Sequence, residues 1–133
     1  MGSFSDFWEN EILDHVFKTG AYTAPGTIYV SLHKTTVADN HTGATVPGEV
    51  SGGNYARVQC NTWDAAASGA TENTQPVTFN LATADCNTVT HFAICDNLSS
   101  GNLLAWGALG TAKHIQSGDQ AKFATGDIDV TLA

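Results

Sequence analysis

Four residues between positions 60 and 95 are of the types that bind zinc: Cys60, Cys86, His91 and Cys95. Thiolates and imidazoles around one zinc ion lie within about 4 Å of one another. Residues 88–95 alternate like a strand, however, and four strand steps separate His91 from Cys95 by about 13 Å. We therefore expect no metal and no other cofactor. Because the number of cysteines is odd, we expect free, buried thiols.

Two carboxylates near the C-terminus have a second spacing of chemical interest. Asp127 and Asp129 would lie about 7 Å apart on one side of a strand, which is open to acid–base work or to a cation. They alternate with Ile128, Val130 and Leu132, however, as in an ordinary half-solvated strand. The sequence contains no Gly-x-Ser-x-Gly, phosphate loop or dinucleotide-binding motif. We therefore expect a protein that is not an enzyme.

The single arginine of the chain, Arg57, follows two glycines in the segment 49–58, Glu-Val-Ser-Gly-Gly-Asn-Tyr-Ala-Arg-Val. Gly52 and Gly53 allow backbone angles that are closed to other residues, and Glu49 lies just upstream of them. The guanidinium can bind a carboxylate or carbonyl within the chain, or it can form an ion pair between subunits. We keep both alternatives. The contact residues expected here are Glu49, Gly52, Gly53, Tyr55 and Arg57.

An aromatic stripe near the N-terminus predicts a helix over about residues 4–19. The stripe consists of Phe4, Trp8, Ile12 and Val16, four apart, with Phe7, Leu13 and Phe17 beside them. Ser3 and Asp6 have the spacing of a capping box, Lys18 suits the last turn, and Gly20 can end the helix. The stripe either contacts a partner or packs against the rest of the domain. The contact residues expected in it are Phe4, Phe7 and Trp8.

After Pro25-Gly26 the apolar period changes to two, which predicts strands. We expect them at 28–33, 55–60, 77–80, 88–95, 103–109, 112–116, 120–124 and 128–132. Residues 88–95 are apolar on both faces and should form a central strand. Short strands separated by turn residues favour a single all-β domain over residues 1–133, an antiparallel, jelly-roll-like β-sandwich with one N-terminal α-helix.

The polar segment 34–54 has no clear periodicity and is longer than an ordinary connection in a compact domain. Such a segment either extends as a free loop tip or docks against something. We predict that it works at a contact.

Composition excludes two classes of partner. Thirteen acidic side chains against five basic ones give a formal net charge of −8. Binding to nucleic acid needs clustered cations, so we expect no nucleic-acid partner. No stretch approaches the ~20 apolar residues that span a bilayer, so we expect no membrane partner and synthesis in the cytosol.

Four segments, in this order and spacing, resemble a family of small tailed-phage virion proteins. They are 49–58, Val-Thr-His-Phe-Ala-Ile-Cys-Asp (89–96), Gly-Asn-Leu-Leu-Ala-Trp-Gly-Ala-Leu (101–109) and Gly-Asp-Ile-Asp-Val-Thr-Leu (126–132). The resemblance covers nearly the whole chain. Members of the family are often labelled tail-fibre proteins, and similar ones serve as head decoration or cement proteins. The resemblance implies a structural component of the virion.

From this resemblance we expect a capsid decoration or cement protein that is assembled in the host cytoplasm. It would self-associate as a trimer and bind the major capsid protein, or other virion proteins, to stabilise the head. The alternative is a tail fibre or baseplate module whose exposed tyrosines and tryptophans bind host glycans. A third alternative is a cytosolic carbohydrate-binding or scaffold domain unrelated to phage.

Overall fold

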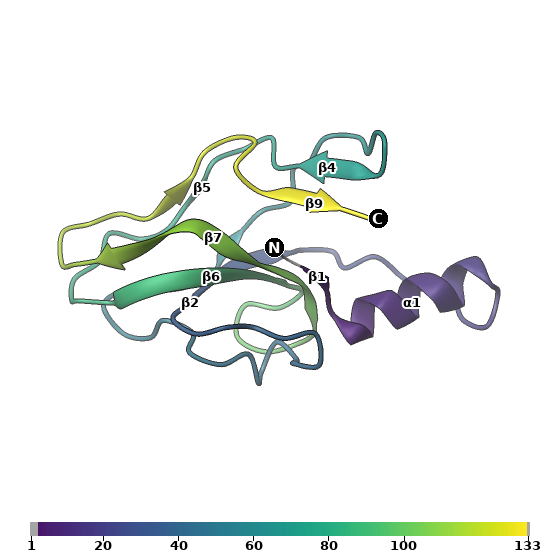
Figure 1. Cartoon of the computed structure of the whole chain (residues 1–133), viewed down its shortest axis with the longest axis horizontal. Coiled ribbons are helices and arrows are strands. Elements are labelled where there is room, and N and C mark those ends of the chain that lie inside the picture. Colours follow the sequence, from purple (N-terminus) through teal and green to yellow (C-terminus); the bar gives the residue numbers. More distant parts are fainter. Residues whose placement is uncertain (1–2, 133) are drawn as a thin grey trace.

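An antiparallel sheet of five strands, in the order β1-β7-β6-β2-β3, forms the centre of the molecule (Figure 1). The structure is a computed structural model that describes residues 3–132. Its elements are β1 (Ser3–Phe4), α1 (Asp6–Val16), β2 (Tyr29–His33), β3 (Val58–Gln59), β4 (Ala70–Glu72), β5 (Val77–Thr78), β6 (Asn87–Cys95), β7 (Leu103–Ile115), β8 (Lys122–Phe123) and β9 (Asp129–Thr131). The predicted all-β class with one N-terminal helix is confirmed.

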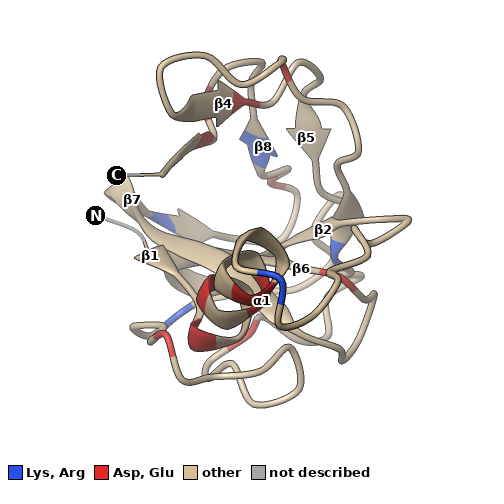
Figure 2. Cartoon of the chain, turned by 90° about the vertical axis from the view of Figure 1, so that its right-hand side faces the viewer, with Lys and Arg blue, Asp and Glu red and all other residues tan. Residues whose placement is uncertain are grey.

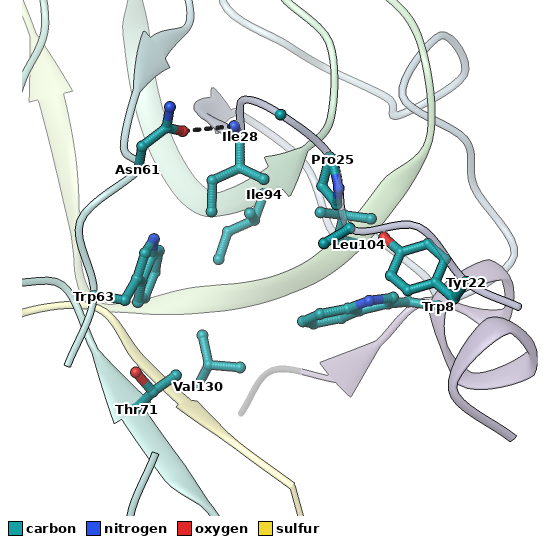
Figure 3. A pocket seen from close by; sticks show the side chains of 12 residues that line it. Trp8, Tyr22, Pro25, Ile28, Asn61, Trp63, Thr71, Ile94, Leu104 and Val130 are labelled. Carbon is teal, nitrogen blue, oxygen red and sulfur yellow. Dashed lines mark hydrogen bonds between the residues drawn. The ribbon is translucent and has the colours of Figure 1, made fainter. Parts of the chain in front are cut away.

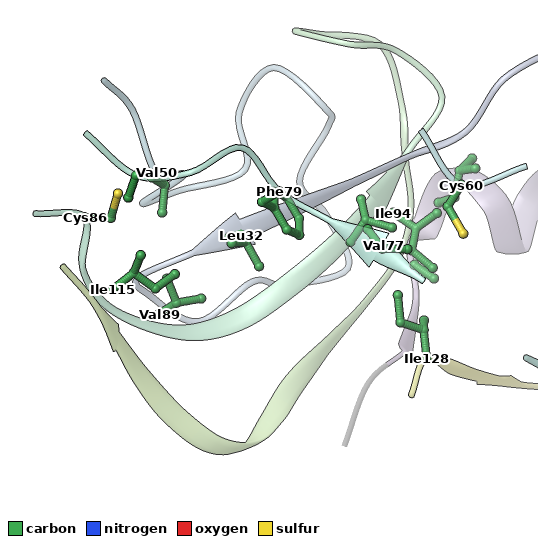
Figure 4. Packing of buried hydrophobic residues seen from close by; sticks show 14 residues of the cluster. Leu32, Val50, Cys60, Val77, Phe79, Cys86, Val89, Ile94, Ile115 and Ile128 are labelled. Atoms are coloured by element: carbon green, nitrogen blue, oxygen red, sulfur yellow. The ribbon is translucent and has the colours of Figure 1, made fainter. Parts of the chain in front are cut away.

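The main core lies between this sheet and two short antiparallel ladders, β4-β9 and β5-β8, which form the opposite layer (Figure 2). Leu32 and Ile94 from the sheet meet Val77 and Ile128 from the ladder side, and all four are at most 4% exposed (Figure 4). The facing layer is therefore two separate ladders and not one continuous second sheet. β6 lies between β7 and β2, so the prediction of a central strand at 88–95 is confirmed.

A second, smaller core covers the other face of the sheet. Here Ala93, Cys95 and Leu103 of the sheet pack against Val37 and Val46 of the long segment that follows β2. Val46 is 8% exposed, and the other four are fully buried. The predicted contact segment thus packs against its own sheet and is not a free loop tip. Its contact with another molecule stays a prediction.

The helix begins two residues later than predicted. Phe4 belongs to β1 and pairs with Ala105 of β7. Ser5 is the N-cap, and its side chain accepts a hydrogen bond from the backbone N–H of Trp8 at 3.2 Å. The capping role predicted for Ser3 is therefore wrong, because strand pairing holds the chain extended up to Phe4.

The helix also ends three residues earlier than predicted, at Val16. Lys18 lies beyond it with a φ of 68°, in the left-handed region that usually favours glycine. The backbone N–H of Gly20 donates to the carbonyl of Asp14 at 3.2 Å. The predicted places of Lys18 in the last turn and of Gly20 as the terminator are therefore wrong, since Lys18 itself takes the terminating conformation.

The predicted strands differ from the observed ones mainly at their ends. The segments 103–109 and 112–116 form one continuous strand, β7, because Gly110 between them stays extended. β3, β5 and β8 are two residues long and shorter than predicted. β4 was not predicted, since Ala-Thr-Glu has no apolar alternation, and it forms because β9 pairs with it.

Candidate functional site

Arg57 lies beneath the predicted contact segment and is 5% exposed. Its Nε and Nη2 donate to the two carboxylate oxygens of Glu49, each at 2.8 Å. Its remaining N–H groups donate to the carbonyls of Gly43, Asn97 and Ser100 at 2.7, 2.9 and 3.2 Å. All five donors of the guanidinium therefore have acceptors. We call these five residues the latch.

The latch decides between the two alternatives for Arg57. The ion pair with Glu49 forms within the chain, and the carbonyl contacts join the segment after β2 to the turn between β6 and β7. Because the guanidinium uses its hydrogen-bonding capacity inside one chain, Arg57 fixes the loops and does not bridge subunits through that group.

Tyr55 extends the latch to the sheet. Its hydroxyl donates to the Glu49 carboxylate at 2.9 Å and accepts from the backbone N–H of Leu32 at 3.0 Å. Burial, followed by the nearby Glu49 charge, raises the pKa of Tyr55 well above its ordinary value. Burial alone would raise the pKa of Glu49, but the hydrogen bonds and charge of Arg57 lower it overall. Glu49 is therefore ionised at neutral pH.

His33 lies at the edge of the latch and is fully buried. Its Nδ1 lies 3.0 Å from the carbonyl of Pro47, and its Nε2 lies 2.7 Å from the hydroxyl of Ser31. Burial lowers the pKa of His33. The ring is therefore neutral at pH 7 and serves as an internal hydrogen-bonding group.

Gly52 and Gly53 form the turn that brings Arg57 back to the sheet. Their φ angles are 72° and 57°, and Asn54 follows with a φ of 69°. A Cβ added to Gly52 would meet nothing within 4 Å, so the need for glycine there is conformational and not steric. The special backbone angles predicted for this pair are confirmed.

The helix α1 projects from one end of the molecule, and backbone hydrogen bonds at its N-terminus join it to the body (Figure 1). We call α1 and the return segment 17–24 the arm. The Ser5 N–H donates to the carbonyl of Leu104 at 2.8 Å, and its hydroxyl donates to the carbonyl of Leu103. The Asp6 N–H donates to the carbonyl of Asp39 at 2.9 Å. No residue of α1 is buried.

Three predicted contact residues, Phe4, Phe7 and Trp8, lie at the base of the arm. The rings of Phe4 and Trp8 are 4.4 Å apart, and Phe7 meets Tyr22 edge to face at 6.5 Å. All three are partly buried against the main core. The packing alternative therefore holds for this half of the stripe, although part of each side chain stays accessible.

The outer half of the stripe is in water. Leu13, Val16 and Phe17 are 54%, 57% and 72% exposed. We call these three side chains the tip of the arm. Exposed apolar side chains that gather on one surface are typical of sites that bind another molecule.

An aromatic pocket of about 350 Å³ lies beside the base of the arm, between the central sheet and the β4-β9 ladder. Trp8 and Tyr22 line one side of it, and Trp63 and Val130 line the other, with Ile94 of the sheet at its floor (Figure 3). These side chains make the pocket predominantly apolar.

The side chains that could bind a metal or act in catalysis do not lie together in one site. Cys60, Cys86 and Cys95 are buried free thiols, as predicted, and burial raises the pKa of Cys95 to about 11. Within residues 3–132, no group of three or more His, Cys, Asp or Glu side chains is placed to hold a metal ion. The Asp127 carboxylate accepts a hydrogen bond from the Ala124 N–H at 2.7 Å and so stabilises a turn.

Comparison with known proteins assigns this chain to a class of molecule. The chain is a bacteriophage virion protein. It belongs to the family described as Podophage GP4 fiber I protein gp80, whose sequence model matches residues 3–131. No curated protein matches the chain. Among the described residues, no helix has the length and apolar character to cross a membrane.

Sequence reasoning missed the separation of the stripe into a packed base and a free tip. The period of four placed all its members on one face of the helix, but only the tertiary fold determines where the sheet ends beneath that face. The charge of α1 is a signal that was available, because Asp6, Glu9, Glu11 and Asp14 lie among the apolar residues and favour an accessible helix.

Proposed function

We propose that the chain is a non-catalytic subunit of a tail-fibre appendage of the phage particle, and that it self-associates as a trimer. The exposed tip of the arm is the observation on which this proposal depends. An isolated subunit gains nothing from placing Leu13, Val16 and Phe17 in water, whereas an assembly buries them and is stabilised by doing so.

The rest of the chain supports a mechanical role. Two cores, one on each face of the sheet, and the latch with its five satisfied donors make a stiff body that carries a projecting arm. The match to a fibre family supports the tail over the head.

Location in the particle tests the proposal. Purified particles are labelled with an antibody against this chain and imaged by cryo-electron microscopy. Label restricted to the tail region supports a fibre subunit. Hundreds of symmetric copies on the head, bound to the major capsid protein, would instead identify a decoration or cement protein. Absence from the particle would overturn the virion role.

A further inference from the structure

We propose that the tip of the arm of one copy inserts into the aromatic pocket of a second copy, so that subunits join tip to pocket. This inference rests on the self-association stated under the proposed function and names the two surfaces that carry it. The pocket and the tip are different surfaces of the same chain, so the contact is heterologous.

The pocket favours an apolar occupant over a sugar. A sugar presents many hydroxyl groups, each of which needs a hydrogen-bonding partner when it is buried. Three of the polar side chains that line the pocket already bond to backbone groups: Asn61 Oδ1 accepts at 2.9 Å, and Trp63 and Thr71 donate at 2.9 and 2.7 Å. What they leave is mainly carbon surface from Trp8, Trp63 and their aliphatic neighbours (Figure 3).

The tip has the matching chemistry but cannot reach the pocket of its own chain. Trp8 is part of the pocket wall, and Phe17 follows it nine residues later. Because a helix rises 1.5 Å per residue, about 13 Å of rigid helix separates the two. A second copy is therefore the source of a tip that fills the pocket.

The end of the arm and the pocket offer one pair of opposite charges, although α1 itself also carries Asp6, Glu9, Glu11 and Asp14. Lys18 lies next to Phe17 at the end of the arm, whereas the Asp96 and Glu11 carboxylates lie near Tyr22 at the pocket. After burial, these two carboxylates are the largest causes of the raised pKa of Tyr22. Lys18 on an incoming arm would approach these acids, which offsets part of the repulsion between two chains of net charge −8.

A tip-to-pocket contact has a geometric consequence. Each copy offers one tip and one pocket, so a chain of such contacts closes into a ring or continues as a row. A ring of three would give the trimer expected from the sequence, with every tip and every pocket used once.

Sedimentation velocity on the full chain tests the contact with a matched pair of substitutions. Leu13 and Leu98 are both 54% exposed, but Leu98 is not part of the arm and lies in the turn between β6 and β7. We expect Leu13→Ser and Phe17→Ser to weaken self-association by about 10- to 100-fold, and Leu98→Ser to leave it unchanged. Circular dichroism checks that each variant is folded.

A mixing experiment tests the heterologous geometry. Ala24 is an exposed residue of the pocket wall, so Ala24→Trp places an indole over the opening. At a concentration where Phe17→Ser is monomeric, we expect this variant to be monomeric alone as well. Mixed together, the two should form a one-to-one dimer, because one supplies an intact tip and the other an intact pocket.

Three results would overturn the inference: self-association that Phe17→Ser leaves intact, failure of the two monomeric variants to pair, or occupation of the wild-type pocket by oligosaccharide in crystals with the tip still free. These results concern isolated chains. They leave the location of the protein in the particle, which tests the proposed function, as a separate question.

Discussion

The latch and the arm each contain residues that were predicted to make contacts, and the two regions have opposite characters in the structure. At the latch every donor of Arg57 finds an acceptor within the chain, and the side chain is 5% exposed. At the tip of the arm, Phe17 is 72% exposed and lies beyond the last residue of the helix. A buried arginine whose donors are all satisfied stabilises its own subunit, whereas exposed apolar side chains leave a surface that a partner can cover.

The largest effect on stability is expected at the latch. Arg57→Ala leaves the Glu49 carboxylate partly buried without its partner, and we expect a loss of about 3–5 kcal/mol in the free energy of unfolding. Urea denaturation followed by circular dichroism measures the loss. Lys113→Ala, on the exposed part of β7, is the control and should change the value by less than about 0.5 kcal/mol. A loss below 1 kcal/mol at Arg57 would mean that the latch contributes little.

Acid should weaken the latch by a smaller amount, because a protonated Glu49 can still form part of its hydrogen bonds. The folded protein lowers the pKa of both His33 and Glu49, so the unfolded chain binds the extra protons. Stability should therefore fall as the pH drops below the ordinary His value of 6.5, and again below the ordinary Glu value of 4.5. Urea titrations at a series of pH values test this, and Glu49→Gln should flatten the lower limb.

A substitution in the glycine turn should cost less again. Gly52→Ala forces a side chain into a backbone with φ of 72°, which costs roughly 1–2 kcal/mol although the space is open. Gly52→Asn should recover much of this, because asparagine tolerates the left-handed region. Thermal unfolding ranks the two variants. Equal melting temperatures for wild type and Gly52→Ala would show that the turn relaxes into another conformation.

The smallest effect on the isolated subunit is expected at the tip. Phe17→Ser should change the free energy of unfolding of the monomer by less than about 0.5 kcal/mol, since the side chain is mostly in water before and after unfolding. Urea denaturation at a concentration where wild type is monomeric measures this. A cost above 2 kcal/mol would show that Phe17 stabilises its own subunit, and the contrast between latch and arm would disappear.

The strand pattern and the helix followed from the sequence because they depend on local periodicity. Residues 88–95 are apolar on both faces, and β6 is indeed the central strand. The start of the helix could not be predicted from the sequence, since Phe4 pairs with Ala105, which lies far along the chain. The same limitation applies to β4, which exists only because β9 pairs with it.

The hydrogen-bond partners of Arg57 could not all be predicted from the sequence, because some of them lie far along the chain. The Glu49 partner is eight residues away and was predicted as one alternative. The carbonyls of Asn97 and Ser100 are 40 and 43 residues away. Because every residue has a backbone carbonyl, the residue types do not indicate which carbonyls accept. The exposure of the tip could not be predicted either, because the apolar residues have the same period where the helix packs against the sheet and where it projects into water.

Incorporation into particles most directly tests the claim that the arm makes this chain a structural subunit. Phage lacking the gene is grown in cells that supply wild type, Phe17→Ser or Leu98→Ser, and the copies per purified particle are measured by quantitative immunoblotting. We predict normal incorporation of wild type and Leu98→Ser, and loss of Phe17→Ser from particles although the folded protein remains in the lysate. Equal incorporation of all three would contradict the account.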